Sequence, residues 1–167
     1  MHGGGGLDEH ARGQARRYAA LGYVVFACDM LGDGVAGDRD RVIGCLTTLR
    51  DDPSAMVRRA RAGLTALSRC PGAGGPVAAI GFCFGGMVVL TLARSGEPLA
   101  SAVSIHGSLA TAAARPAEPG LVRARLLACH GALDPPGAVT GVAYHPLADA
   151  RSFADVRGFL SDVFAEG

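Results

Sequence analysis

Three short apolar runs, each closed by glycine or aspartate, constrain the fold of this chain more than any other feature of its sequence. They cover residues 23–29, 77–82 and 124–131, and a fourth run of lower apolar density covers residues 99–107. Continuous apolar runs are typical of strands buried on both faces of a parallel sheet, whereas a strand with one wet face alternates. The sequence therefore predicts about four parallel strands.

Helical patterns separate these runs. Apolar side chains recur at helical spacing over residues 8–21, 38–49, 53–67, 85–93 and 148–164. Gly22 closes the first pattern, and Asp52 followed by Pro53 is typical of a helix start. Because strands and helices alternate, we expect an α/β fold in which helices cover both faces of a mostly parallel sheet.

Length and charge narrow the class of protein. The 167 residues are predicted to form one domain, 1–167, and a hydrophobic content of 49% is enough for a sizeable core. Sixteen basic and fifteen acidic residues leave no basic patch for a nucleic acid, so the expected partner is a small molecule. No apolar run approaches the roughly 20 residues that span a bilayer, and no signal peptide is recognisable.

The cysteines indicate a compartment. There are five of them, an odd number, and none forms a C-x-x-C pair. A reducing cytoplasm is the simplest setting for such a chain.

The residues Gly81-Phe82-Cys83-Phe84-Gly85 fit G-x-C-x-G, the cysteine version of a nucleophile elbow. A sharp strand-to-helix turn places its central residue at a helix N-terminus, and glycines on either side leave room for that turn. There the backbone N–H of Phe84 can stabilise a developing oxyanion. Cys83 is thus a candidate nucleophile; the alternative is a buried, inert cysteine in a glycine-rich turn.

Other polar residues follow the predicted strands. His106, His130 and Asp134 come directly after apolar runs, as Cys83 does. Ligands of open α/β sheets bind beyond the carboxyl ends of the strands, so we expect these four residues to face one crevice.

Four segments resemble the dienelactone hydrolase family of α/β-hydrolases: "HGGGGLDEHARGQARRYAALGYVVFACDMLGDG", "AAIGFCFGGMVVLTLARSG", "LLACHGALDP" and "AYHPLADARSFADVRGFLSDVF". The resemblance implies a three-layer α/β-hydrolase-type sandwich and a Cys-Asp-His triad that opens ester or lactone bonds without a cofactor or metal. The nucleophile of the family matches Cys83 and its acid matches Asp134. The alternative for Asp134 is a turn residue before Pro135.

The chain departs from the family pattern after Asp134. Only ten residues separate Asp134 from His145, the last histidine of the sequence, whereas the family places a helix, a strand and a histidine-bearing loop there. A helix of three turns alone needs about 11 residues. We therefore expect the domain to be incomplete between about residues 135 and 141. His145 is a candidate base, with a surface or cap histidine beside Pro146 as the alternative.

The N-terminal residues also differ from the pattern. His2-Gly3-Gly4-Gly5 resembles the H-G-G-G oxyanion loop of esterases, in which a backbone N–H of Gly3 or Gly4 would be the second oxyanion donor. Gly3 stands where the family commonly has glutamate. Because no strand precedes this loop, we expect it to be incomplete and weakly anchored, and the sheet to expose edges through which copies could associate.

Two main functions remain open. One is a thiol hydrolase that acts on ester or lactone carbonyls. The other is a catalytically impaired family remnant without the triad histidine, acting at most as a small-molecule binding module. Less favoured are a redox-sensing Cys83 and a metal site formed by His2, His106 and His130.

Overall fold

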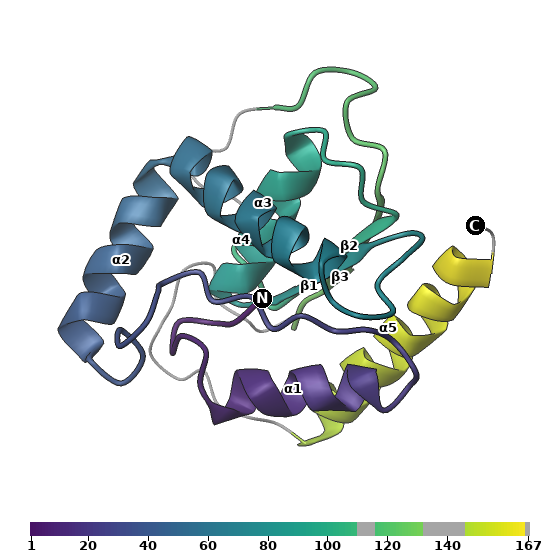
Figure 1. Cartoon of the computed structure of the whole chain (residues 1–167), viewed down its shortest axis with the longest axis horizontal. Coiled ribbons are helices and arrows are strands. Elements are labelled where there is room, and N and C mark those ends of the chain that lie inside the picture. The colour runs from purple at the N-terminus through teal and green to yellow at the C-terminus, as the bar shows by residue number, and fades with distance from the viewer. Residues whose placement is uncertain (110–115, 132–145, 166–167) are drawn as a thin grey trace.

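The computed structural model describes residues 1–109, 116–131 and 146–165. Figure 1 shows their arrangement. In chain order the helices and strands are α1 (Glu9–Ala19), α2 (Arg39–Asp51), α3 (Pro53–Ser68), β1 (Ala78–Phe82), α4 (Phe84–Arg94), β2 (Ser101–Ile105), β3 (Arg125–Cys129) and α5 (Pro146–Ala165).

The strands form a parallel sheet with the order β1-β2-β3. Ile80 of β1 is in register with Val103 of β2, which is in register with Leu127 of β3. The predicted strands at 77–82, 99–107 and 124–131 are therefore confirmed. Since all three run the same way, their carboxyl ends lie at one edge of the sheet.

Helices cover both faces of this sheet. Figure 1 places α2, α3 and α4 on one side of the sheet and α1 and α5 on the other. Alternate residues of β2 supply the two cores: Ala102 belongs to the cluster under α4, and Val103 packs with Val156 and Leu160 of α5. The predicted α/β-hydrolase-type three-layer sandwich, reduced in strand number, is confirmed.

The first three helices begin at aspartate caps. The side chains of Asp8, Asp38 and Asp52 each accept a hydrogen bond from the backbone N–H three residues further on. Such caps satisfy N–H groups that have no intrahelical acceptor, and each contributes about 1 kcal/mol. All five predicted helices are present, with ends shifted by a few residues at most.

The predicted strand at residues 23–29 is wrong: these residues form no strand. Val24, Val25 and Phe26 are 43%, 37% and 40% exposed instead of buried on both faces. A strand requires a neighbouring backbone to pair with, and among the described residues the edge of β1 that faces this segment bonds only to Met1. The described sheet therefore has three strands where about four were expected.

The expectation of burial on both faces is also wrong for β3. Leu126 is 52% exposed, whereas Leu127 packs against the α5 side. Helix α4 packs on β1 and β2, and α5 on β2 and β3, so one face of β3 lacks a helix among the described residues. Within those residues, no helix is long and apolar enough to span a bilayer.

Candidate active site

Cys83 occupies the turn between β1 and α4. Its backbone has φ 51° and ψ −112°, and positive φ is rare for a residue with a side chain. Its N–H donates to the carbonyl oxygen of Ile105 at 3.0 Å, and its own carbonyl accepts from Gly86 at 3.0 Å. The turn is thus held on both sides by the sheet and by the first turn of the helix.

Both outer glycines of the motif are sterically required. A Cβ on Gly81 would lie 1.9 Å from the carbonyl oxygen of Gly85, and a Cβ on Gly85 would lie 2.5 Å from that of Met1. These contacts are with backbone atoms, which cannot rotate away as a side chain can. The G-x-C-x-G spacing therefore forms the strained strand-to-helix turn that the sequence predicted.

The helix N-terminus supplies one donor beside Cys83. Helix α4 begins at Phe84, so the N–H of Phe84 has no intrahelical acceptor. The Cys83 side chain makes no capping hydrogen bond to the helix, and Cys83 is partly exposed. A thiol in this place meets the positive end of the helix dipole and remains accessible.

The glycine loop lies against the elbow. A Cβ built on Gly3 would be 3.5 Å from the Cβ of Cys83 and 3.6 Å from the carbonyl oxygen of Phe82, so Gly3 is in van der Waals range of the turn. Gly4 follows next to Leu46 of α2, with a Cβ position 3.7 Å from its side chain. The structure thus brings Gly3 and Cys83 together.

His2 anchors this loop, contrary to the weak anchoring expected from its place in the sequence. The side chain is buried, its Nε2 accepts from the N–H of Met30 at 2.9 Å, and its Nδ1 lies 2.7 Å from the carbonyl oxygen of Gly3. Because Nε2 is an acceptor, the ring is neutral with its proton on Nδ1, which donates to Gly3. The ring also stacks on Phe84 at 6.5 Å between centroids.

An acidic neighbour of His2 has other partners. Asp29 Oδ1 lies 3.4 Å from Nε2, but it accepts the N–H groups of Leu31 and Gly32 at 2.9 and 3.2 Å. We therefore regard the pair as a carboxylate beside a neutral imidazole. No local pattern in the sequence reveals this role of His2, because its partner Met30 is 28 residues away.

Two other predicted residues follow the neighbouring strands. His106, directly after β2, has φ 50°, and its N–H donates to the carbonyl oxygen of Cys129 at 2.7 Å. His130 follows β3 and is exposed. His106, His130 and Cys83 therefore lie at the carboxyl edge of the sheet as expected. Neither histidine joins His2 in a metal-ligand group within the part of the chain that the structure describes.

Asp134 and His145 lie outside the described residues. Their predicted roles as acid and base therefore stay predictions. The described part of the site consists of the elbow at Cys83, the N–H of Phe84 and the loop at Gly3 and Gly4.

A strained residue on a strand-to-helix turn, a glycine loop against it and a helix-covered parallel sheet define the α/β-hydrolase class of protein. Within that class, the chain belongs to the dienelactone hydrolase family, whose sequence pattern matches residues 1–150.

Two solved structures are similar over nearly the whole chain. The one named m3DLH is 33% identical with a TM-score of 0.85. A crystal structure of a dienelactone hydrolase-like promiscuous phosphotriesterase from metagenomic libraries is 31% identical with a TM-score of 0.87. In both comparisons the match covers 97% of this chain and 84% of the other. No curated protein sequence matches significantly.

Proposed function

We propose that this protein hydrolyses carboxylic esters or lactones through a covalent intermediate on Cys83. The observation that carries the proposal is the backbone of Cys83: a φ of 51° is costly for a side-chain-bearing residue, and such strain gathers at functional sites. Membership of the dienelactone hydrolase family supports the same chemistry.

In the first step, the Cys83 thiolate attacks the carbonyl carbon, and the electron pair of the C=O bond moves to oxygen. The N–H of Phe84 and an N–H of Gly3 or Gly4 would hold this oxyanion, since Gly3 lies against Cys83. The tetrahedral intermediate then expels the alkoxide, which takes a proton, and leaves a thioester on Cys83.

In the second step, water attacks the carbonyl carbon of the thioester while a base removes a proton from that water. The C–S bond then breaks, which restores the Cys83 thiolate and releases the carboxylic acid. We assign the base to His145 and its orientation to Asp134, because a carboxylate fixes the tautomer of an imidazole and stabilises its protonated form. Without a base, an ordinary thiol is only a few per cent ionised near pH 7.

Hydrolysis of p-nitrophenyl acetate and of an aryl lactone tests this proposal. Wild-type protein should release product with an acetylated Cys83 detectable by mass spectrometry after rapid acid quenching. Cys83→Ala should lower the rate by at least about a thousandfold. Cys70→Ala is the matched control, because Cys70 is a half-buried free thiol just after α3 that donates to the carbonyl oxygen of Ala66. Equal loss in both variants would contradict the assignment.

The alternative is a catalytically impaired remnant that binds small molecules at most. The short interval between Asp134 and His145 favours it, because ten residues leave little room for the family's histidine-bearing loop. The variant His145→Ala separates the two functions. A large loss of turnover supports a working triad, whereas a wild-type rate equal to that of buffer establishes the remnant.

Phosphotriesters are a second class of substrate that we propose to test with the same hydrolysis assay. One similar structure belongs to a promiscuous phosphotriesterase, so an activated aryl phosphotriester is the appropriate probe. Turnover that depends on Cys83 would extend the proposal to phosphorus centres, and no turnover would restrict it to carbonyls.

We also propose a reducing, cytoplasmic setting. All five cysteines are free in the structure, and Cys28 and Cys129 are held as thiols because burial raises their pKa values. Retained activity in a glutathione buffer and its loss on oxidation would support this setting.

A further inference from the structure

One proton of the proposed first step has no assigned carrier. The Cys83 thiol has to lose a proton before its sulfur attacks, and the departing alkoxide has to gain one. A histidine beside the cysteine can do both, because a neutral imidazole accepts a proton and its protonated form donates one. Of the five histidines, His145 lies outside the described residues, so the position of the other four can be compared with that of Cys83.

His106 occupies the strand end next to Cys83. Phe82 of β1 is in register with Ile105 of β2. The residues that follow them, Cys83 and His106, therefore leave the sheet side by side. The N–H of Cys83 donates to the carbonyl oxygen of Ile105 at 3.0 Å, which continues the ladder one residue past the strand. Since neighbouring strands are about 4.8 Å apart, His106 is carried on the strand end nearest to the cysteine.

The two residues share an unusual backbone conformation. Among the described residues, Cys83 and His106 are the non-glycine residues with positive φ, at 51° and 50°. Such a conformation costs about 1–3 kcal/mol for a residue with a side chain and persists only where the surrounding packing imposes it. Residues of this kind gather at functional sites, and here two of them adjoin at the carboxyl edge of the sheet.

The backbone at His106 is held from two sides. Its N–H donates to the carbonyl oxygen of Cys129 in β3 at 2.7 Å. The next residue, Gly107, is buried against α4, where a Cβ on it would lie 2.9 Å from the Cα of Gly86. Because α4 also positions Cys83, the two strand ends are fixed relative to each other. His106 itself is only half-buried, which leaves room for a substrate beside it.

The other described histidines are placed less well for this task. Both ring nitrogens of His2 are already engaged in hydrogen bonds. The ring of His10 lies edge-on to that of Phe82, 6.1 Å away between centroids, and Phe82 packs on the α5 side of the sheet. His130 follows β3, which is two strand spacings, or about 10 Å, from β1.

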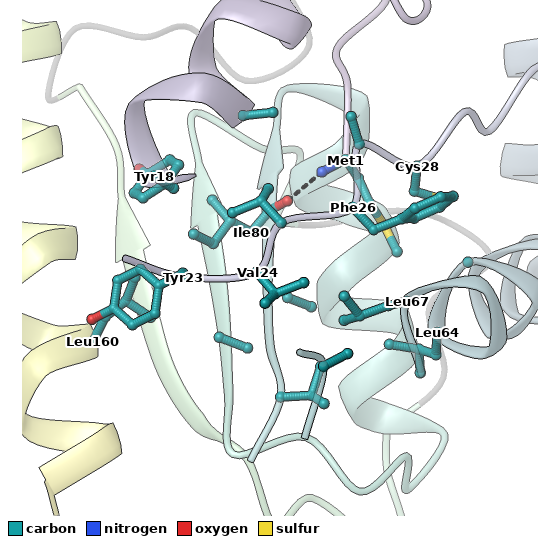
Figure 2. Close-up of a pocket in the computed structure, with 18 of the residues that line it drawn as sticks. Met1, Tyr18, Tyr23, Val24, Phe26, Cys28, Leu64, Leu67, Ile80 and Leu160 are labelled. Atoms are coloured by element: carbon teal, nitrogen blue, oxygen red, sulfur yellow. Dashed lines mark hydrogen bonds between the residues drawn. The ribbon is translucent and has the colours of Figure 1, made fainter. Parts of the chain in front are cut away.

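An apolar pocket on the other side of β1 takes no part in this chemistry. Figure 2 shows its walls, which include Val24, Phe26 and Ile80. Neither Cys83 nor His106 lines it. The reacting groups therefore belong to the carboxyl edge of the sheet.

We propose that His106 is the general base and acid of the first step, an inference that rests on the proposed function. The S–H bond of Cys83 breaks as its proton passes to the neutral imidazole of His106, and the thiolate attacks the carbonyl carbon. When the C–O bond to the leaving group breaks, the protonated imidazole gives that proton to the alkoxide and becomes neutral again. His145 keeps its assigned role as the base for the water of the second step.

Alkylation by iodoacetamide at pH 7 tests the pair without any substrate. His106→Gly removes the imidazole, and glycine adopts a φ of 50° without strain, so the fold should persist. Mass spectrometry should show Cys83 alkylated about tenfold more slowly in this variant, since an unassisted thiol is only a few per cent ionised near pH 7. His130→Gly is the matched control and should react as wild type, because His130 is exposed one strand further away.

Rapid-quench assays with p-nitrophenyl acetate then separate the two chemical steps. His106→Gly should slow the acetylation of Cys83 about a hundredfold, whereas His145→Ala should let acetylated Cys83 accumulate. Added imidazole should restore part of the rate of His106→Gly, because glycine leaves space where the ring was. His106→Asn, which also tolerates positive φ, fills that space without supplying a base and should not be restored.

Wild-type rates of alkylation and acetylation in His106→Gly would overturn the inference, and so would an equal loss in His130→Gly. A loss that imidazole does not restore would also overturn it, because His106 would then have a structural role only. If wild-type protein hydrolyses no ester, the proposed function fails, yet the alkylation rates still decide whether His106 activates Cys83. The two failures are therefore distinguishable.

Discussion

Replacing Gly81 by alanine is the most direct test of the close packing between β1 and α4 at the elbow. The added Cβ would lie 1.9 Å from the carbonyl oxygen of Gly85, 2.1 Å from its carbonyl carbon and 2.6 Å from the amide nitrogen of Gly86. Ordinary van der Waals contacts begin near 3.4 Å. The first turn of α4 would therefore have to move away from β1 by more than 1 Å.

The cost of that movement follows from the packing. Forcing one extra carbon into a tight core costs about 1–3 kcal/mol, and here the obstacle is backbone rather than a movable side chain. We expect a loss of about 3 kcal/mol, a large part of the 5–15 kcal/mol that stabilises a typical domain. For a chain of this size that corresponds to a melting temperature lower by roughly 10 °C.

Circular dichroism melts and urea titrations measure the change. Gly13→Ala is the control: Gly13 lies within α1, and a Cβ there would meet nothing within 4 Å. Alanine is the better helix former, so Gly13→Ala should gain about 0.5–1 kcal/mol. If the melting temperature of Gly81→Ala lies within about 2 °C of wild type, β1 and the first turn of α4 are not in close contact at Gly81.

Two further perturbations probe the site and its anchor. Cys83→Gly should relieve the strained φ and raise the free energy of unfolding by about 1 kcal/mol while abolishing ester turnover; unchanged or lower stability would show that the strain is small. His2→Phe keeps an aromatic ring but leaves the N–H of Met30 unpaired and Gly3 untethered. It should cost about 2 kcal/mol in urea titrations and lower turnover with Cys83 intact, whereas loss of stability alone would assign His2 a purely structural role.

The helices and the elbow were predictable because their signals are local. Asp8 and Asp38 cap helices through bonds to residues three positions further on, which a sequence displays directly. In the same way, Gly81 and Gly85 flank Cys83 in the sequence, and a Cβ on Gly81 would clash with the backbone of Gly85 only four residues away. Residues 78–82, 101–105 and 125–129 form strands as their apolar runs indicate.

Two features, the conformation of residues 23–29 and the anchoring of His2, depend on residues distant in the sequence, and only the tertiary structure decided them. Residues 23–29 have the composition of a buried strand, but a strand exists only where another backbone supplies hydrogen bonds, and none does so there among the described residues. His2 looks like part of a mobile terminus until Met30 donates to it across 28 positions. The sequence by itself determined the α/β class and the turn at Cys83, because both arise from short-range sterics and periodicity. Only the packed chain decided which strand edge stays open and what holds the glycine loop against the cysteine, because those depend on contacts between segments that no local pattern encodes.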